Sequence, residues 1–124
     1  GMSRPIGALF HVAHGISNAM LIKECLSYVI DGSYKKFAKI ARVINEDNDK
    51  LNDKEASEEF INELDKICSI CEIPTLKEYG INKDEFYKVI DKMAGDAMNS
   101  GSPSNTIKDI SKQDLINIYE KLWK

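Results

Sequence analysis

The chain has 124 residues, enough for one domain with a substantial hydrophobic core but too few for two. Hydrophobic residues make up 43% and charged residues 30%, with seven Gly and three Pro, and this globular composition excludes a disordered chain. The net charge is −3, with acidic and basic residues interspersed, which argues against a nucleic-acid partner because phosphate binding needs a concentrated basic face.

The sequence also lacks the features of an exported or membrane-bound protein. It has no run of about 18 apolar residues that could cross a bilayer, and its first residues lack the basic region and apolar core of a signal peptide. Its three cysteines are an odd number at low density, which suits a reducing compartment. We therefore expect a cytoplasmic protein with no membrane partner.

Helical periodicity dominates the first half of the chain. Residues 5–10 predict a short helix that breaks before His14, and residues 16–30 predict a second helix that is apolar on nearly every face and therefore deeply buried. Ser33 can cap a third helix, whose apolar residues recur at i, i+3, i+4 and i+7 spacing as far as Ile44.

Capping signals divide the second half of the chain into three more helices. Asp53 can cap a fourth helix, which Pro74 ends. Asn82 and Glu85 form a potential capping box for a fifth helix, and Ser111 can cap the last one. Because no segment reads convincingly as a strand, we predict an all-α fold, a single helical bundle-like domain of five or six helices that spans the whole chain.

Cys68 and Cys71 form a CxxC pair in the predicted fourth helix. Such a pair can serve as half of a zinc site or as a redox dithiol. The chain has no second CxxC, however, and both sulfurs fall on or near the apolar stripe of the helix. Since free cysteines are usually buried, we predict a structural, buried role for both.

Both histidines of the chain, His11 and His14, lie near its start. Small residues and glycines flank them, and the predicted apolar helix begins directly afterwards. On a continuous helix, a spacing of three residues would place the two imidazoles on one face. A ligand or metal site would be built in such a place, and the alternative is a purely structural contact at the start of a helix.

Residues 4–21 resemble the signature of the iron-containing (group III) alcohol dehydrogenases. In that family a His-rich helix runs into a Pro-His-Gly turn, and an apolar helix rich in Asn, Ala and Leu follows. Here Ala13 replaces the proline of the turn. Three later segments resemble the family in the same order, at residues 73–81, 100–105 and 109–123, so that the resemblance covers essentially the whole chain.

The resemblance implies a two-domain fold and a set of site residues. Family members join an N-terminal α/β domain that binds NAD or NADP to a dehydroquinate synthase-like helical domain, which holds iron or zinc through one Asp and three His. His14 matches the last of these histidines, and Arg4 and His11 match positions near the substrate pocket. The metal acts there as a Lewis acid while hydride moves to or from the nicotinamide. Residues 106–108, Thr-Ile-Lys, depart from the Asn-Pro-Arg that is common in the family.

By the same resemblance, the other three ligands and the glycine-rich dinucleotide loop would precede Gly1. We therefore expect a truncated C-terminal part of an alcohol dehydrogenase, without the N-terminal dinucleotide-binding domain. One imidazole cannot hold a divalent metal in a defined geometry. The chain alone is expected to bind neither metal nor NAD(P) and to be inactive without a separately encoded dinucleotide-binding half. The alternative is a non-catalytic helical remnant that acts as a self-association or protein-binding module.

We also expect a homo-oligomer. A helix that is apolar all round and is not covered by upstream helices would expose a larger apolar patch than monomers usually tolerate. Pairing of two chains about a two-fold axis would bury that patch. The predicted patch combines residues of the first two helices: Ile6, Phe10, Met20, Ile22, Cys25 and Val29.

Overall fold

The computed structural model describes residues 1–123, and in that range it contains six α-helices and no β-strand, which confirms the all-α prediction. The α-helices are α1 (Ser3–Phe10), α2 (His14–Val29), α3 (Tyr34–Ile44), α4 (Asp53–Ile70), α5 (Lys83–Asn99) and α6 (Lys112–Lys121). Short 3-10 helices are η1 (Ile30–Gly32), η2 (Glu46–Lys50) and η3 (Ser102–Asn105). None of the helices in residues 1–123 combines the length and apolarity needed to cross a membrane.

Side-chain caps begin most of these helices, as the sequence predicts. Ser33, Asn82 and Ser111 accept hydrogen bonds from backbone amides in the first turns of α3, α5 and α6. The prediction for α4 is wrong by one residue, because Asn52 and not Asp53 is the cap. Asp53 is instead the first residue of α4, and its carboxylate forms an ion pair with α3.

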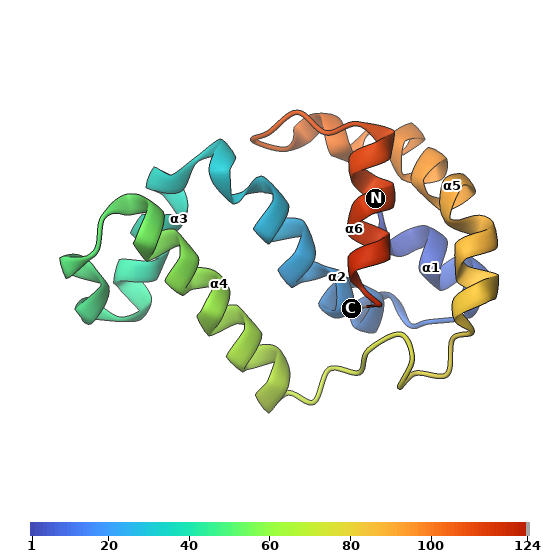
Figure 1. Ribbon diagram of the computed structural model, residues 1–124, viewed down its shortest axis with the longest axis horizontal. Coiled ribbons are helices and arrows are strands. Elements are labelled where there is room, and N and C mark those ends of the chain that lie inside the picture. The colour runs from blue at the N-terminus through green and yellow to red at the C-terminus, as the bar shows by residue number, and fades with distance from the viewer. Residues whose placement is uncertain (124) are drawn as a thin grey trace.

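The helices form two groups that α2 connects (Figure 1). Helices α1, α5 and α6 lie together on one side of α2, whereas α3 and α4 form a hairpin that projects on the other side (Figure 1). A large cluster of buried apolar residues holds the first group together, and a separate small cluster holds the hairpin. The chain therefore has one main core and one satellite core.

Phe86 of α5 lies in the middle of the main core. Its side chain is fully buried, and its ring centroid lies 5.6 Å from that of Phe10, 5.9 Å from that of Tyr119 and 5.4 Å from that of Trp123. These rings belong to α1, to α6 and to the turn after α6. One residue of α5 therefore packs against both ends of the chain, and the aromatic pairs add to the free energy gained by burial.

Tyr119 also ties the first residues of the chain to α6. Its hydroxyl donates a buried hydrogen bond of 2.6 Å to the carbonyl oxygen of Met2. Burial raises the pKa of this phenol, so it stays protonated and remains a donor. The Met2 thioether in turn accepts a hydrogen bond from the Cys25 thiol of α2 at 3.7 Å. The start of α1 is thus fixed between α2 and α6.

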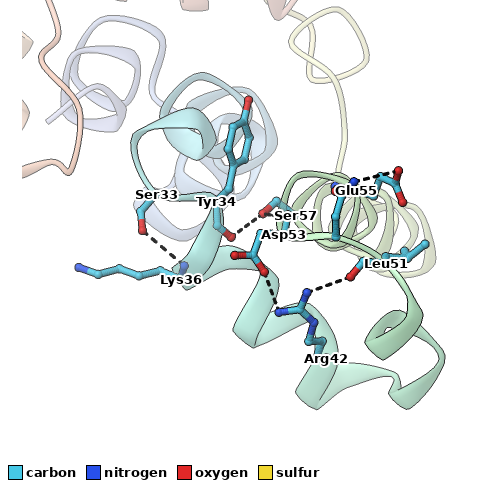
Figure 2. A network of polar contacts seen from close by, with 9 residues as sticks. Ser33, Tyr34, Lys36, Arg42, Leu51, Asp53, Glu55 and Ser57 are labelled. Carbon is cyan, nitrogen blue, oxygen red and sulfur yellow. Dashed lines mark hydrogen bonds and ion pairs between the residues drawn. The ribbon is translucent and has the colours of Figure 1, made fainter.

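Small residues let α3 and α4 approach closely in the hairpin. Ala38, Ala41 and Ala56 are buried between the two helices. Polar contacts fasten its ends, as Figure 2 shows: the Ser57 hydroxyl donates to the Tyr34 carbonyl oxygen at 2.8 Å. Asp53, which the sequence predicted as the cap of α4, forms an ion pair across the hairpin: Arg42 Nη1 lies 2.9 Å from Asp53 Oδ1.

The end of α4 contradicts the prediction that the CxxC pair is buried. Cys71 is exposed and Cys68 only half-buried. Here α4 ends in a Schellman motif, in which the Ile73 amide donates to the Cys68 carbonyl and the Glu72 amide to the Ser69 carbonyl. The last turn of α4 therefore lies at the surface, because no other helix covers the side that carries Cys71.

Glu72 in this motif has φ +54°, a left-handed conformation that glycine adopts without steric cost. We expect Glu72→Gly to raise the free energy of unfolding by roughly 0.5–1 kcal/mol. As the control, Glu58→Gly in the exposed middle of α4 should lower it by about 1 kcal/mol. Urea denaturation of the three proteins tests this, and equal effects of the two substitutions would contradict the assignment.

Candidate functional site

The two histidines lie at the junction between α1 and α2, where His11 follows the last residue of α1 and His14 is the first residue of α2. His11 ends α1 with φ 55°, and this left-handed residue turns the chain before α2 begins at His14. The helix is thus interrupted between them, and the helical spacing that would put both rings on one face does not apply. Both side chains are exposed to solvent.

Asn18 holds the ring of His14. Its Nδ2 lies 3.1 Å from His14 Nε2, one helical turn along α2. The direction of this hydrogen bond depends on the tautomer of the His14 ring. The backbone beside the ring is also fixed, because the buried Ser17 hydroxyl donates to the His14 carbonyl oxygen at 3.0 Å. His14 is therefore an exposed imidazole with a defined orientation.

Arg4 lies apart from the two histidines. It is exposed in the first turn of α1, whereas His11 follows the last turn of the same helix. Seven residues of α-helix separate their Cα atoms by about 10 Å along the axis, at a rise of ~1.5 Å per residue. The structure therefore brings the two histidines to one junction and leaves Arg4 at the other end of α1.

Residues 1–123 do not by themselves form a metal centre. Within residues 1–123, no group of three or more His, Cys, Asp or Glu side chains lies close enough together to hold a metal ion. A structural or catalytic zinc or iron site usually needs at least three protein ligands. His14 therefore belongs to no such group within the described residues.

A groove of about 470 Å³ lies between the first residues of the chain, α2 and the segment from η3 to α6. Asn18, which holds the His14 ring, also lines this groove. Most of its lining is apolar: Met2, Leu21, Ile22, Cys25, Val29 and Ile110. The predicted apolar patch included Ile22, Cys25 and Val29, but only the structure shows that they form one wall of an open groove.

The Cys25 thiol in this groove is not a reactive group. Burial raises its pKa to about 11, so it is almost entirely protonated at neutral pH. Since the thiolate is the nucleophile and the metal ligand, Cys25 contributes packing to the groove and no chemistry.

Lys108 fastens the opposite wall of the groove to α2. Its ammonium lies 2.8 Å from the Asp31 carboxylate, donates to the Tyr28 carbonyl oxygen at 3.0 Å and lies 4.1 Å from the centroid of the Tyr28 ring. The hydrogen bond to Asp31 is the main reason that the pKa of Lys108 is raised. In the sequence, Lys108 was notable only because it stands where the family commonly has Arg. Nothing in the sequence indicated that Tyr28 and Asp31 would be its partners.

The structure corrects two features of the predicted apolar patch. Ile6 is fully buried in the main core, so it is not available at the surface. Helix α2 is not deeply buried on every side either, because only Ser17 and Leu21 of its residues are buried and Ile22 is 40% exposed. The prediction failed because a helix that is apolar all round can still lie against one neighbour and face a groove on another side.

Comparisons with known proteins agree with this fold. The sequence profile of the Fe-containing alcohol dehydrogenase family, C-terminal, matches residues 1–123. The NADPH-dependent butanol dehydrogenase of Clostridium saccharobutylicum is 29% identical over 126 residues, which cover 98% of this chain and 31% of that protein. The choline dehydrogenase of Bacillus subtilis is 28% identical over 122 residues, with 98% of this chain and 29% of that protein covered.

Two solved structures share the fold. A 1,3-propanediol oxidoreductase superposes with a TM-score of 0.87 at 24% identity, over 98% of this chain and 31% of that one. An alcohol dehydrogenase from Oenococcus oeni superposes with a TM-score of 0.86 at 24% identity and with the same coverage. Nearly the whole chain is therefore matched, but it spans only about 31% of the length of these relatives.

Proposed function

The chain belongs to the Fe-containing alcohol dehydrogenase family, and on that premise we propose that it supplies the C-terminal helical part of a metal-dependent, NAD(P)-linked oxidoreductase of alcohols or aldehydes. The observation that carries this proposal is the profile match over residues 1–123. The names of the relatives support the substrate class, since they include a butanol dehydrogenase, a choline dehydrogenase and a lactaldehyde reductase.

In this proposal His14 is one of the metal ligands, and Asn18 is the residue that orients its ring. The exposed position of His14 at the first turn of α2 supports this role, because a metal ion held by residues outside this chain can reach its ring. A metal-bound histidine commonly donates its second ring N–H to a hydrogen-bond acceptor, and the side-chain amide of Asn18 can accept through its oxygen. His11, at the same junction, and Arg4, at the far end of α1, are proposed to face the substrate.

We further propose that the remaining ligands and the dinucleotide site come from protein outside residues 1–124, in the same polypeptide or in a separate one. The groove beside α2 supports this arrangement, since its apolar wall and the His14 ring are linked through Asn18. A non-catalytic module is the second candidate, and the exposed apolar residues Ile40, Val43 and Ile44 of α3 favour it.

The proposal can be tested with a chimera. The part of the C. saccharobutylicum butanol dehydrogenase that precedes its matched region would be joined to residues 1–124. We expect NADPH-dependent butyraldehyde reduction by the chimera, and no measurable turnover by residues 1–124 alone, because the latter offer at most two imidazoles and no hydride donor. Metal retained after dialysis should likewise be far below one equivalent for residues 1–124 alone.

Two outcomes would contradict the proposal. One is metal- and cofactor-dependent turnover by residues 1–124 alone. The other is an inactive chimera that nevertheless binds NADPH and shows the helix content of a folded protein. NADPH binding, followed by nucleotide fluorescence, separates the second outcome from a chimera that simply fails to fold.

A further inference from the structure

Cys68 and Cys71, the CxxC pair at the end of α4, are both within reach of solvent. Cys71 is exposed and Cys68 is half-buried, so the structure removes the burial on which a purely structural role depended. Two thiolates also fall short of the four ligands of a structural zinc site, and no group of three or more potential ligands occurs in residues 1–123. The interpretation that agrees with this placement is a redox dithiol.

The backbone of α4 places the two thiols on one face of its last turn. Cys71 is the C-cap, with φ −77° and ψ 0°, and its amide donates to the Ile67 carbonyl oxygen at 2.9 Å. Cα atoms three residues apart in a helix are separated by about 5 Å, within the range of about 4.4–6.8 Å across disulfides. Cβ atoms at this spacing are about 5–6 Å apart, so formation of a disulfide requires them to approach by about 1–2 Å.

The last turn of α4 has room for this small movement, because little packs against it. Ile67 is 53% exposed and Ile70 is 80% exposed. Helix α4 ends at the edge of the molecule, and no helix follows until α5 (Figure 1). A disulfide that forms with some strain is easily reduced again, which is typical of exchanging disulfides and not of structural ones.

The three cysteines of the chain differ in accessibility. Cys71 is open to attack from solvent, whereas Cys68 lines a small pocket of about 160 Å³ between α2, the end of α4 and the end of α6. Cys25 lines the separate groove beside α2, and burial raises its pKa to about 11. Since the thiolate is the reacting species and needs access to its target, Cys71 should react first and Cys25 should not react.

We propose that Cys68 and Cys71 form a redox-active dithiol that exchanges with low-molecular-weight disulfides such as glutathione disulfide. The Cys71 thiolate attacks one sulfur of glutathione disulfide, so that a mixed disulfide forms, the original disulfide bond breaks and one glutathione leaves with the proton that Cys71 gave up. The Cys68 thiolate then attacks Cys71 Sγ and releases the second glutathione in the same way. Two protein thiols are oxidised and one glutathione disulfide is reduced. This activity is independent of the metal-binding role proposed for His14.

Intact mass spectrometry of the 124-residue chain after treatment with glutathione disulfide tests the proposal. Wild type should become lighter by two hydrogen atoms and carry no glutathione, and dithiothreitol should restore its mass. Cys68→Ser should instead keep one glutathione on Cys71, because the second step is blocked. Cys71→Ser should react at least about tenfold more slowly, because its remaining thiol in α4 is less accessible. Peptide mapping should find Cys25 reduced in every case.

A relocated cysteine is the matched control for the geometry. The double variant Cys71→Ser, Ile70→Cys keeps two thiols in the same turn but places them about 200° apart around the helix. It should form mixed disulfides with glutathione and no bond within the chain, and circular dichroism checks that it keeps its helix content. The proposal would be overturned if wild type stays reduced, stops at a glutathione adduct or reacts first at Cys25. Closure of the relocated pair as readily as the wild-type pair would overturn it as well.

Discussion

Phe86→Ala is expected to lower the free energy of unfolding by about 3–5 kcal/mol, the usual cost of removing a fully buried phenylalanine. The ring of Phe86 contacts Phe10, Tyr119 and Trp123, so its loss leaves a cavity that three separate segments border. Since domains of this size are stable by only about 5–15 kcal/mol, the variant would be partly unfolded at moderate urea concentrations. Urea denaturation followed by circular dichroism measures the effect.

Tyr87 provides the matched control for Phe86. It is the next residue of α5, it is also aromatic, and it is 38% exposed. Tyr87→Ala should cost less than about 1.5 kcal/mol, because more than a third of this residue is already exposed to water in the folded chain. Similar costs for the two variants would mean that the main core does not centre on Phe86.

His14→Ala is expected to abolish turnover of the butanol dehydrogenase chimera and to weaken its metal binding by about 100-fold or more. Loss of a residue that hydrogen-bonds to a metal ligand already costs roughly 10–100-fold in metal affinity. Loss of the ligand itself is expected to cost more. Metal retained after dialysis against a mild chelator, measured by elemental analysis, gives a readout that does not depend on activity.

Two further variants show whether His14 acts as a ligand or only as a structural residue. Asn18→Ala keeps the imidazole and removes its 3.1 Å contact, so we expect an intermediate loss of metal, about 10-fold. His11→Ala removes the neighbouring imidazole and should leave metal retention unchanged. If His14→Ala retains as much metal as wild type, His14 is not a ligand. If His11→Ala loses the metal instead, the site has been assigned to the wrong histidine.

The sequence by itself was sufficient to predict the helices and most of their caps, and to detect the family resemblance. Ser33 and Ser111 cap their helices because a cap is a local interaction between a side chain and an amide three residues later. The His14 segment could be matched to the family for the same reason, since its motif is contiguous in the chain.

Only the tertiary structure decided which apolar and polar side chains are covered. Periodicity indicates that a helix has an apolar face, but the covering partner can be far away in the sequence, as Met2 and Tyr119 are. Ile6 is therefore buried, although it was predicted at the surface, and Cys71 is exposed, although it was predicted in the core. The groove beside α2 arises from packing between distant segments, which no local pattern specifies.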